Sequence, residues 1–378
     1  MRVLITGGAG FIGSRLAKRL AAGGASLTLL DNLSPQVHGE HAAFAPDLLQ
    51  VAECVRGDIR DQPLLARLLA GQQVVVHLAA ETGTGQSMYA VKQYEDVNIR
   101  GTALLLDVLV NDPKRTVSKI VLASSRAVYG EGKYECREHG VVCPPARSAA
   151  LLSAGRFDPA CPACGTTLSV LATTEDVRFA PSSFYGLTKQ VQEQMVLMFA
   201  TTLGISGLGL RYQNVYGPGQ SLSNPYTGIL AVFSNLVRQG KGIDVFEDGL
   251  ESRDFVYVDD VIDATAAVVD PSISGVHALN VGSGVRTSVL EVAEAVVRHF
   301  RADVPVRVTG NFRLGDIRHN FADISALQRI TPFAPKWSFA AGLREFLHWA
   351  EQYEASEAGF ERSLLELRER GLLGTASS

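Results

Sequence analysis

Tyr185 and Lys189 are the residues whose types and spacing first suggest acid–base chemistry. They lie four positions apart in a segment, 183–200, whose apolar spacing predicts a helix. Residues at that spacing share one helix face, so the ammonium would lie beside the phenol. A neighbouring positive charge lowers the pKa of a phenol and helps its oxygen to accept a proton near neutral pH. The same spacing is common in surface pairs, so the surrounding sequence must distinguish a catalytic pair from a surface pair.

Two serines favour the acid–base interpretation. Ser124 and Ser125 follow the apolar run 120–123, which predicts a buried parallel strand. Open α/β sheets bind their ligands at the carboxyl ends of such strands. A hydroxyl at that edge can hold a substrate oxygen while Tyr185 removes its proton.

Glycines near the start of the chain predict a dinucleotide site. Gly7, Gly10 and Gly13 follow a short apolar run and open a helical pattern. This spacing permits a tight turn, a close approach to a pyrophosphate and a helix N-terminus directed at its charge. Asp31 comes eighteen residues after Gly13, where a carboxylate accepts hydrogen bonds from both ribose hydroxyls. It would repel a ribose phosphate, which favours NAD over NADP, although Arg15 would offset part of that repulsion.

A third group of side chains is typical of a metal site. Two short knuckles of the same form, at 136–140 and 161–165, each place two soft or borderline ligands three positions apart. Four such ligands suit a structural, tetrahedral zinc ion. The predicted ligands are Cys136, His139, Cys161 and Cys164, with Cys143 as an alternate for His139 and reduced, unliganded thiols as the other possibility.

The elements that must position these groups alternate between strand and helix. Apolar runs at 3–5, 27–30, 74–78, 120–123 and 208–210 predict parallel strands, with helical patterns between them. The predicted fold class is α/β: a Rossmann doubly wound parallel sheet with a smaller mixed α/β substrate domain and a cysteine-rich insertion. The predicted dinucleotide-binding domain spans 1–213, and residues 250–283 are predicted to return to it. A zinc-ribbon-like insertion is predicted at 131–181. The predicted substrate domain consists of 214–249 and 284–350, and a C-terminal helix with a frayed tail follows at 351–378.

The composition excludes several classes of protein. The chain has 378 residues, of which 46% are hydrophobic and 20% charged, enough to bury a large core. Its net charge of −4 and the lack of a long basic run argue against nucleic acid or a membrane as a partner. No signal peptide or membrane-spanning run is recognised, so we expect a cytoplasmic protein with reduced cysteines.

These motifs, at their mutual spacing, closely resemble the extended short-chain dehydrogenase/reductase family, specifically its NAD-dependent nucleotide-sugar epimerases and dehydratases. The resemblance spans residues 1–350. It implies a catalytic triad of Ser125, Tyr185 and Lys189, with Ser124 the weaker neighbour. It also implies tightly bound NAD, a nucleotide-diphosphate sugar as substrate, and a homodimer formed through helices such as 94–109 and 183–200.

The family's motifs extend the site residue by residue. For the cofactor, the resemblance implies Gly7, Gly10, Phe11, Ile12, Gly13, Asp31, Asn32, Asp58, Ile59, Leu78, Ala79, Ala80, Asn98, Tyr185 and Lys189. For Asn98, a polar residue at a helix start is an equal alternative. For the sugar diphosphate, the resemblance implies Gln86, Ser87, Ser125, Asn214, Asn224, Tyr226, Arg253, Arg313 and Asp316. The two arginines fit this role because a planar guanidinium matches phosphate oxygens.

The residues after Ser125 narrow the expected reaction. In the family's dehydratases and decarboxylases carboxylates stand there, whereas this chain has Arg126 and Ala127, which do no acid–base work at a sugar carbon. What remains is oxidation at C4 to a 4-keto sugar and re-reduction on the other face, the reaction of an NAD-dependent 4-epimerase. A 4-keto nucleotide-sugar reductase would use the same residues. A non-catalytic module that senses NAD or a nucleotide sugar is the alternative from another class.

The substrate is suggested by resemblance alone. Segments 33–38, 246–249 and 315–319, with the cysteine-bearing insertion, resemble those of bacterial dTDP-L-rhamnose 4-epimerases, which form dTDP-6-deoxy-L-talose. UDP-glucose/galactose and UDP-glucuronate 4-epimerases are the alternatives.

Overall fold

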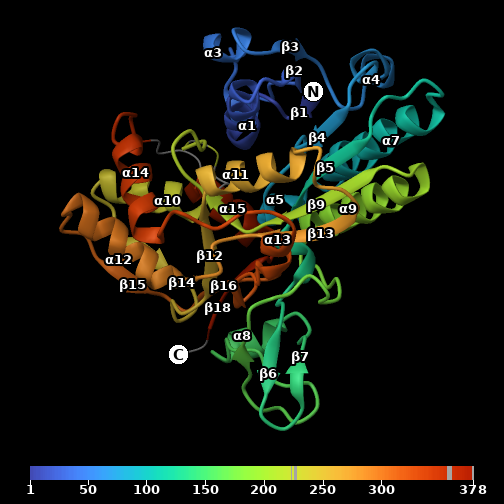
Figure 1. Cartoon of the computed structure of the whole chain (residues 1–378). Coiled ribbons are helices and arrows are strands. Elements are labelled where there is room, and N and C mark those ends of the chain that lie inside the picture. Colours follow the sequence, from blue (N-terminus) through green and yellow to red (C-terminus); the bar gives the residue numbers. More distant parts are fainter. Residues whose placement is uncertain (223, 225–227, 356–359, 377–378) are drawn as a thin grey trace.

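A seven-stranded parallel sheet forms the centre of the molecule (Figure 1). The computed structural model describes residues 1–222, 224, 228–355 and 360–376. The strand order β13-β9-β5-β4-β1-β2-β3 confirms the doubly wound fold predicted from the sequence. The strands are β1 (Arg2–Thr6), β2 (Ser26–Asp31), β3 (Glu53–Arg56), β4 (Val74–His77), β5 (Lys119–Ser125), β9 (Ser206–Tyr212) and β13 (Val276–Val281).

Helices cover both faces of this sheet because its strands are apolar on both sides. Val3 and Ile5 of β1 pack toward the helices α1 (Phe11–Ala22) and α11 (Val258–Val269), whereas Leu4 packs toward the opposite group. That opposite group consists of α4 (Gln62–Leu69), α7 (Gly101–Asn111) and α9 (Phe184–Leu203). Burial on both faces explains why these strands appear in the sequence as continuous apolar runs.

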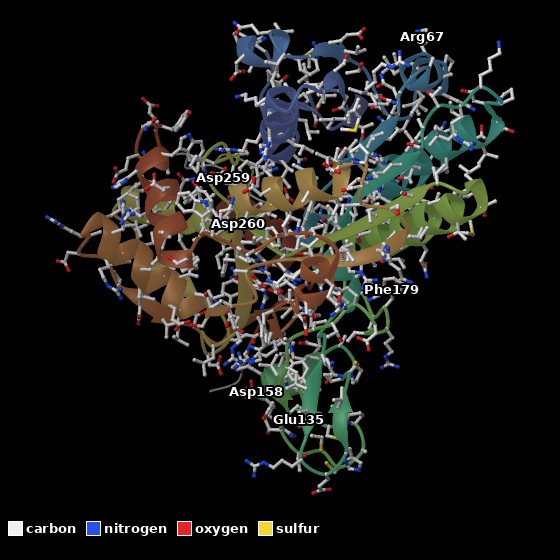
Figure 2. All side chains as sticks on the ribbon, viewed as in Figure 1. Arg67, Glu135, Asp158, Phe179, Asp259 and Asp260 are labelled. Atoms are coloured by element: carbon white, nitrogen blue, oxygen red, sulfur yellow. The ribbon has the colours of Figure 1, made fainter. Side chains whose placement is uncertain are left out.

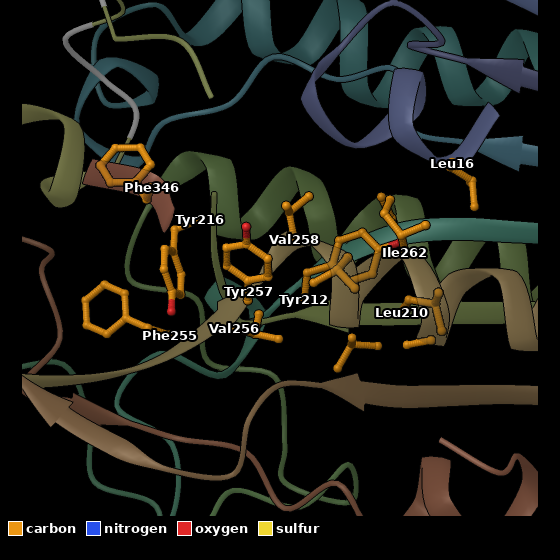
Figure 3. Close-up of a cluster of buried hydrophobic side chains, with 14 of the residues drawn as sticks. Leu16, Leu210, Tyr212, Tyr216, Phe255, Val256, Tyr257, Val258, Ile262 and Phe346 are labelled. Atoms are coloured by element: carbon orange, nitrogen blue, oxygen red, sulfur yellow. The ribbon is translucent and has the colours of Figure 1, made fainter. Parts of the chain in front are cut away.

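A smaller domain continues the same hydrophobic core. Aromatic rings of Tyr216, Phe255 and Tyr257 extend the cluster that begins at Leu16 of α1 (Figure 3). The domain contains the strands β10 (Asn214–Tyr216), β12 (Ser252–Tyr257), β14 (Arg286–Ser288) and β17 (His319–Asn320), and a second pair, β11 (Ile243–Val245) and β15 (Val306–Val308). Its helices are α10 (Ile229–Arg238), α12 (Val289–Phe300) and α14 (Phe339–Ala350). The short helix α13 (Ser325–Ile330) packs against β13 of the large sheet.

The expected return of 250–283 to the first domain needs one correction. α11 and β13 do pack in or on the large sheet, but β12 pairs with β10, β14 and β17 of the smaller domain. The chain crosses between the domains at Tyr257, where β12 ends and α11 begins.

The cysteine-rich insertion leaves the large sheet after β5 and projects from the body of the molecule (Figure 1). It forms a three-stranded antiparallel sheet from β6 (Tyr134–Cys136), β7 (Gly140–Val142) and β8 (Ser169–Val170), beside a short helix, α8 (Ala149–Ser153). Its own hydrophobic cluster is small, with Tyr134, Cys136, Cys161 and Leu168 as its buried members, and Leu152 and Phe157 pack instead against Phe312 of the body. A segment with so few apolar residues needs another source of order.

The C-terminal segment differs from the frayed helix expected at its end. α15 (Phe360–Glu369) is followed by β18 (Leu373–Thr375), which pairs antiparallel with β16 (Asn311–Arg313). Backbone hydrogen bonds to a distant strand hold these residues, and a helical periodicity does not report such pairing. Among the described residues, no helix is long and apolar enough to span a membrane.

The remaining short elements lie in the connections between these strands and helices. They are α2 (Pro35–His38), α3 (Pro46–Leu49), α5 (Thr84–Ser87), α6 (Val91–Tyr94), a π-helical turn η1 (Glu95–Arg100) and a 3-10 turn η2 (Arg126–Tyr129).

Candidate functional site

The glycine loop has the geometry that a dinucleotide requires. Gly7 has a φ of +71°, and a Cβ atom there would lie 2.8 Å from the backbone nitrogen of Ala79. A Cβ atom at Gly13 would overlap the carbonyl oxygen of Gly7. Gly10 begins α1 without a side-chain cap, so backbone N–H groups at this helix N-terminus are available to a pyrophosphate.

Asp31 lies at the carboxyl end of β2 beside this loop. Its carboxylate accepts hydrogen bonds from the backbone nitrogens of Ala9 (3.0 Å) and Leu33 (2.9 Å), which fix its orientation. Arg15 donates to Asp259 and to the Pro218 carbonyl. Because its guanidinium is held there, the repulsion of a ribose phosphate by Asp31 is less offset than the sequence suggested.

Two cavities meet at the predicted catalytic residues. The first, of about 430 Å³, is lined by the glycine loop, Asp31, Leu78–Ala80 and Lys189. The second, of about 380 Å³, lies toward the smaller domain. Their shared wall includes Ser125, Tyr185 and Asn214. A cofactor in the first cavity and a substrate in the second would therefore meet at the phenol of Tyr185.

Local structure places the three catalytic candidates there. Ser125 is the last residue of β5, and Tyr185 and Lys189 lie one turn apart in the first turns of α9. The Ser183 hydroxyl caps that helix by accepting a hydrogen bond from the Gly186 nitrogen. Ser124, the weaker candidate, donates its hydroxyl to the buried carboxylate of Glu193 and is occupied.

Burial dominates the electrostatics of Tyr185 and Lys189. It lowers the pKa of Lys189 to about 7, and its ammonium donates to the Ala123 carbonyl at 2.9 Å. Burial also raises the pKa of Tyr185, whereas the Ser125 hydroxyl and the charge of Arg126 lower it. The sequence assigned that lowering to Lys189. In this structure the lowering comes from the Ser125 hydroxyl and the charge of Arg126.

Several predicted ligand-binding residues lie behind the cavity walls. Asn98 bonds to the backbone of Glu81 and to the Thr188 hydroxyl, which supports its structural interpretation. Gln86 bonds to Gln36, and Ser87 accepts a hydrogen bond from the Tyr185 nitrogen. Asn98, Gln86 and Ser87 therefore position the residues that form the cavity walls.

Of the other predicted binding residues, Asp58 is held by neighbouring side chains, and the rest that the structure describes lie on the cavity walls. Asp58 is held by Arg60 and Asn32, and chiefly the Arg60 side chain lowers its pKa to about 2. Its neighbour Ile59 is on the wall of the first cavity, as are Phe11, Ile12, Asn32 and Asn224. Arg253, Arg313 and Asp316 line the second cavity. Tyr226 lies outside the described residues.

The structure adds residues that the sequence did not single out as ligand-binding. Glu251 lies buried on the wall of the second cavity, where one of its carboxyl oxygens has no hydrogen-bond partner among the described residues. Burial first, and then the charge of Glu247, raise the pKa of Glu251 to about 8. Gln213, on the wall of both cavities, has neither amide atom paired within the described part of the chain. No local motif marks either residue, since both depend on long-range packing.

The predicted metal ligands come together in the insertion. Sγ of Cys136 lies 3.5 Å from Nδ1 of His139 and 3.6 Å from Sγ of Cys164, and Sγ of Cys161 lies 3.6 Å from the same histidine nitrogen. All four ligand atoms lie within 4.8 Å of one another. Cys143 is not part of this group. This donor set and its spacing fit a tetrahedral zinc site.

Ion pairs connect the insertion to segments that line the second cavity. Arg147 of the insertion pairs with Glu131 and Glu247, and Arg318 pairs with Glu247 and with Asp158 of the insertion. Figure 2 shows Asp158 where the insertion meets the body, whereas Glu135 lies farther out. The base of the insertion is therefore part of the structure that supports the cavity.

Comparisons with known proteins agree with this geometry. The model of the NAD dependent epimerase/dehydratase family matches residues 3–147 and 163–282. A dTDP-L-rhamnose 4-epimerase of Burkholderia thailandensis is 40% identical over 354 residues, which cover 93% of this chain and 95% of that protein.

Solved structures agree as well. The UDP-glucose 4-epimerase of Thermotoga maritima with UDP-glucose matches with a TM-score of 0.74 and 26% identity, over 93% of this chain and 99% of that one. The UDP-glucose 4-epimerase of Thermus thermophilus in complex with NAD matches with a TM-score of 0.72 and 26% identity, over 93% and 100% of the two chains.

Proposed function

The chain belongs to the NAD-dependent epimerase/dehydratase family, and we propose that within it the chain interconverts dTDP-L-rhamnose and dTDP-6-deoxy-L-talose. Its relatives and structural neighbours make it an NAD-dependent nucleotide-sugar 4-epimerase. The observation that carries the finer assignment is the 40% identity to a dTDP-L-rhamnose 4-epimerase along nearly the whole of both chains.

The geometry supplies the groups that this reaction needs. Ser125 holds the C4 oxygen, and Tyr185 takes the proton from the C4 hydroxyl and later returns it. NAD, bound along the glycine loop with its adenosine ribose at Asp31, would supply the redox chemistry at C4. Arg126 and Ala127 offer no carboxylate to exchange a proton at C5, so re-reduction on the other face is the remaining outcome.

A UDP-sugar 4-epimerase is the second candidate. It is favoured by the Thermotoga maritima enzyme, which matches with a TM-score of 0.74 and whose structure holds UDP-glucose. Assays of the purified protein with dTDP-L-rhamnose, UDP-glucose and UDP-glucuronate separate the two candidates. A kcat/KM for either UDP-sugar above that for dTDP-L-rhamnose would reverse the assignment.

Retention of the cofactor tests the epimerase mechanism itself. We expect the purified protein to contain NAD and to interconvert C4 epimers with none added. Substrate deuterated at C4 should keep its label, because the same hydrogen leaves and returns. Mass spectrometry of the product measures this. Stoichiometric consumption of added NADH would instead identify a 4-keto sugar reductase, and loss of the label to solvent would identify an enolisation route.

The raised pKa of Glu251 leads us to expect that substrate binding depends on pH. Below about pH 8 its carboxyl group is neutral, and above that pH it places a negative charge in the cavity that receives a diphosphate. We expect KM to rise on the order of tenfold between pH 7 and pH 9. In Glu251→Gln, which stays neutral, KM should remain flat over that range. A wild-type KM that does not change would contradict the role of this carboxyl.

The same shift has a consequence for stability. Folded protein retains a proton on Glu251 that the unfolded chain releases above its ordinary pKa of 4.5. The contribution of this group to the free energy of unfolding is therefore fully present below pH 4.5 and is lost as the pH rises to about 8.

We also propose that Cys136, His139, Cys161 and Cys164 hold a structural zinc ion. The support is the convergence of four suitable donors in a segment whose own core is small. The ion would order the insertion and takes no part in the chemistry at C4. Metal analysis should find about one zinc per chain.

The homodimer remains a prediction. Val110 of α7, and Leu187 and Met198 of α9, are exposed apolar side chains on the two helices that would form it. They fit a helical interface between two copies of the chain.

A further inference from the structure

The C-terminal helix α15 forms part of the wall of the second cavity. Ser363 and Leu367, one turn apart on this helix, line the cavity, and both side chains are buried. Both lie C-terminal to Asp316, the last residue that the sequence assigned to the site. The motifs of the sequence therefore do not account for this part of the wall.

Contacts on two sides hold α15 in this position. Lys241, which follows α10 of the smaller domain, pairs with Glu361 at 3.1 Å. From the first domain, the Tyr89 hydroxyl donates to the Glu366 carboxylate at 2.6 Å, and the Arg370 guanidinium lies 4.3 Å from the centre of the Tyr89 ring. After the helix, β18 pairs with β16 (Figure 1). The helix is thus anchored to both of the domains that enclose the cavity.

Leu367 lies at the end of the cavity where the reaction at C4 takes place. A Cβ atom at Gly85 would lie 3.8 Å from Cδ2 of Leu367, so the leucine lies beside α5. The hydroxyl of Ser87, the last residue of α5, accepts a hydrogen bond from the Tyr185 nitrogen. One short helix therefore separates Leu367 from the catalytic tyrosine, and Gly85, Leu367 and Tyr185 line the same cavity.

An apolar side chain at this end favours one kind of sugar substituent. C6 of a hexose is attached to C5, next to the reacting C4, so it must lie against the wall near Tyr185. A methyl group buried against Leu367 leaves water without losing a hydrogen bond. A hydroxymethyl group there would bury its hydroxyl against an aliphatic side chain, which is unfavourable unless a polar group pairs with it.

We propose that α15 is part of the sugar site, and that Leu367 is a specificity-determining residue which selects nucleotide sugars with a methyl group at C6. The inference rests on the proposed function and deepens it. dTDP-L-rhamnose carries such a methyl group, whereas UDP-glucose carries a hydroxymethyl group at C6 and UDP-glucuronate a carboxylate.

Two sugars that differ only at C6 test the role of Leu367. dTDP-L-mannose is dTDP-L-rhamnose with a hydroxyl added at C6. We expect wild type to favour dTDP-L-rhamnose in kcat/KM on the order of 10- to 100-fold. Leu367→Ala removes the apolar contact, and Leu367→Gln offers the added hydroxyl a polar partner. The preference should therefore fall about threefold in the first variant and about tenfold in the second.

A second leucine of the same helix provides the matched control. Leu365 is exposed, so Leu365→Gln makes the same chemical change without altering the cavity wall. Its preference between the two sugars should equal that of wild type. An unchanged preference in Leu367→Gln, or an equal fall in Leu365→Gln, would overturn the assignment.

Hydrogen exchange of the unsubstituted protein tests the position of α15 without relying on the folding of a variant. With NAD bound, dTDP-L-rhamnose should protect the amides of α15 more than dTDP does, because the sugar then lies against the helix. Equal protection by the two ligands would remove α15 from the sugar site.

The two assays separate this inference from the proposed function. A wild-type protein that does not epimerise dTDP-L-rhamnose would contradict the proposed function, and the exchange comparison would still report whether a sugar lies against α15. A protein that epimerises dTDP-L-rhamnose, with the same preference in wild type and in both Leu367 variants, would contradict the role of Leu367 alone.

Discussion

Tyr185→Phe should lower kcat on the order of 10²- to 10⁴-fold, the contribution of one acid–base group. The change removes the oxygen that accepts the C4 proton and almost no volume, so the packing of α9 against β5 should persist. Bound NAD should stay at the wild-type level, because the glycine loop and Asp31 lie at the other end of the first cavity. Steady-state kinetics and the absorbance of released cofactor measure the two quantities.

A neighbouring phenol provides the matched control. The ring of Tyr94 lies edge-on to that of Tyr185, with 6.4 Å between their centres, and its hydroxyl donates to the Thr82 carbonyl. Tyr94→Phe removes a buried hydroxyl that takes no part in proton transfer, so its loss of kcat should be less than tenfold. Comparable losses in the two variants would mean that packing, and not acid–base catalysis, explains the effect at Tyr185.

Replacement of Cys161 and Cys164 together by serine should remove the metal and unfold the insertion. Structural zinc contributes an apparent binding free energy of about 10–16 kcal/mol, whereas the hydrophobic cluster around the predicted ligands has only four buried members. The insertion should then become sensitive to protease, and NAD content should be unchanged. Metal analysis and limited proteolysis, read by mass spectrometry of the fragments, measure both outcomes.

Two single variants test the ligand set. Cys143 lies outside the cluster, so Cys143→Ser should retain zinc, whereas His139→Ala should lose it. The reverse result would make Cys143 the fourth ligand. A metal-free double variant whose insertion still resists protease would return these cysteines to the role of unliganded thiols.

Local sequence was sufficient to predict those parts of the site whose structure depends on the backbone geometry of a few neighbouring residues. The spacing of Gly7, Gly10 and Gly13 predicted a loop in which side chains would collide, and the structure has that loop. The four-residue spacing of Tyr185 and Lys189 on a helix after a strand that ends at Ser125 was sufficient in the same way, because helix and strand periodicities are local.

Tertiary structure decided which groups remain free to act. Arg253 and Arg313 have the same predicted role in the sequence, yet the Nη groups of Arg253 donate to the 316–318 segment and the Ser252 carbonyl, whereas Nε of Arg313 has no partner among the described residues. The pairing of β12 in the smaller sheet and of β18 with β16 was also missed by the sequence. Each of these outcomes depends on hydrogen bonds between segments tens of residues apart. A periodic pattern records which face of an element is buried, but not which partner satisfies its polar groups.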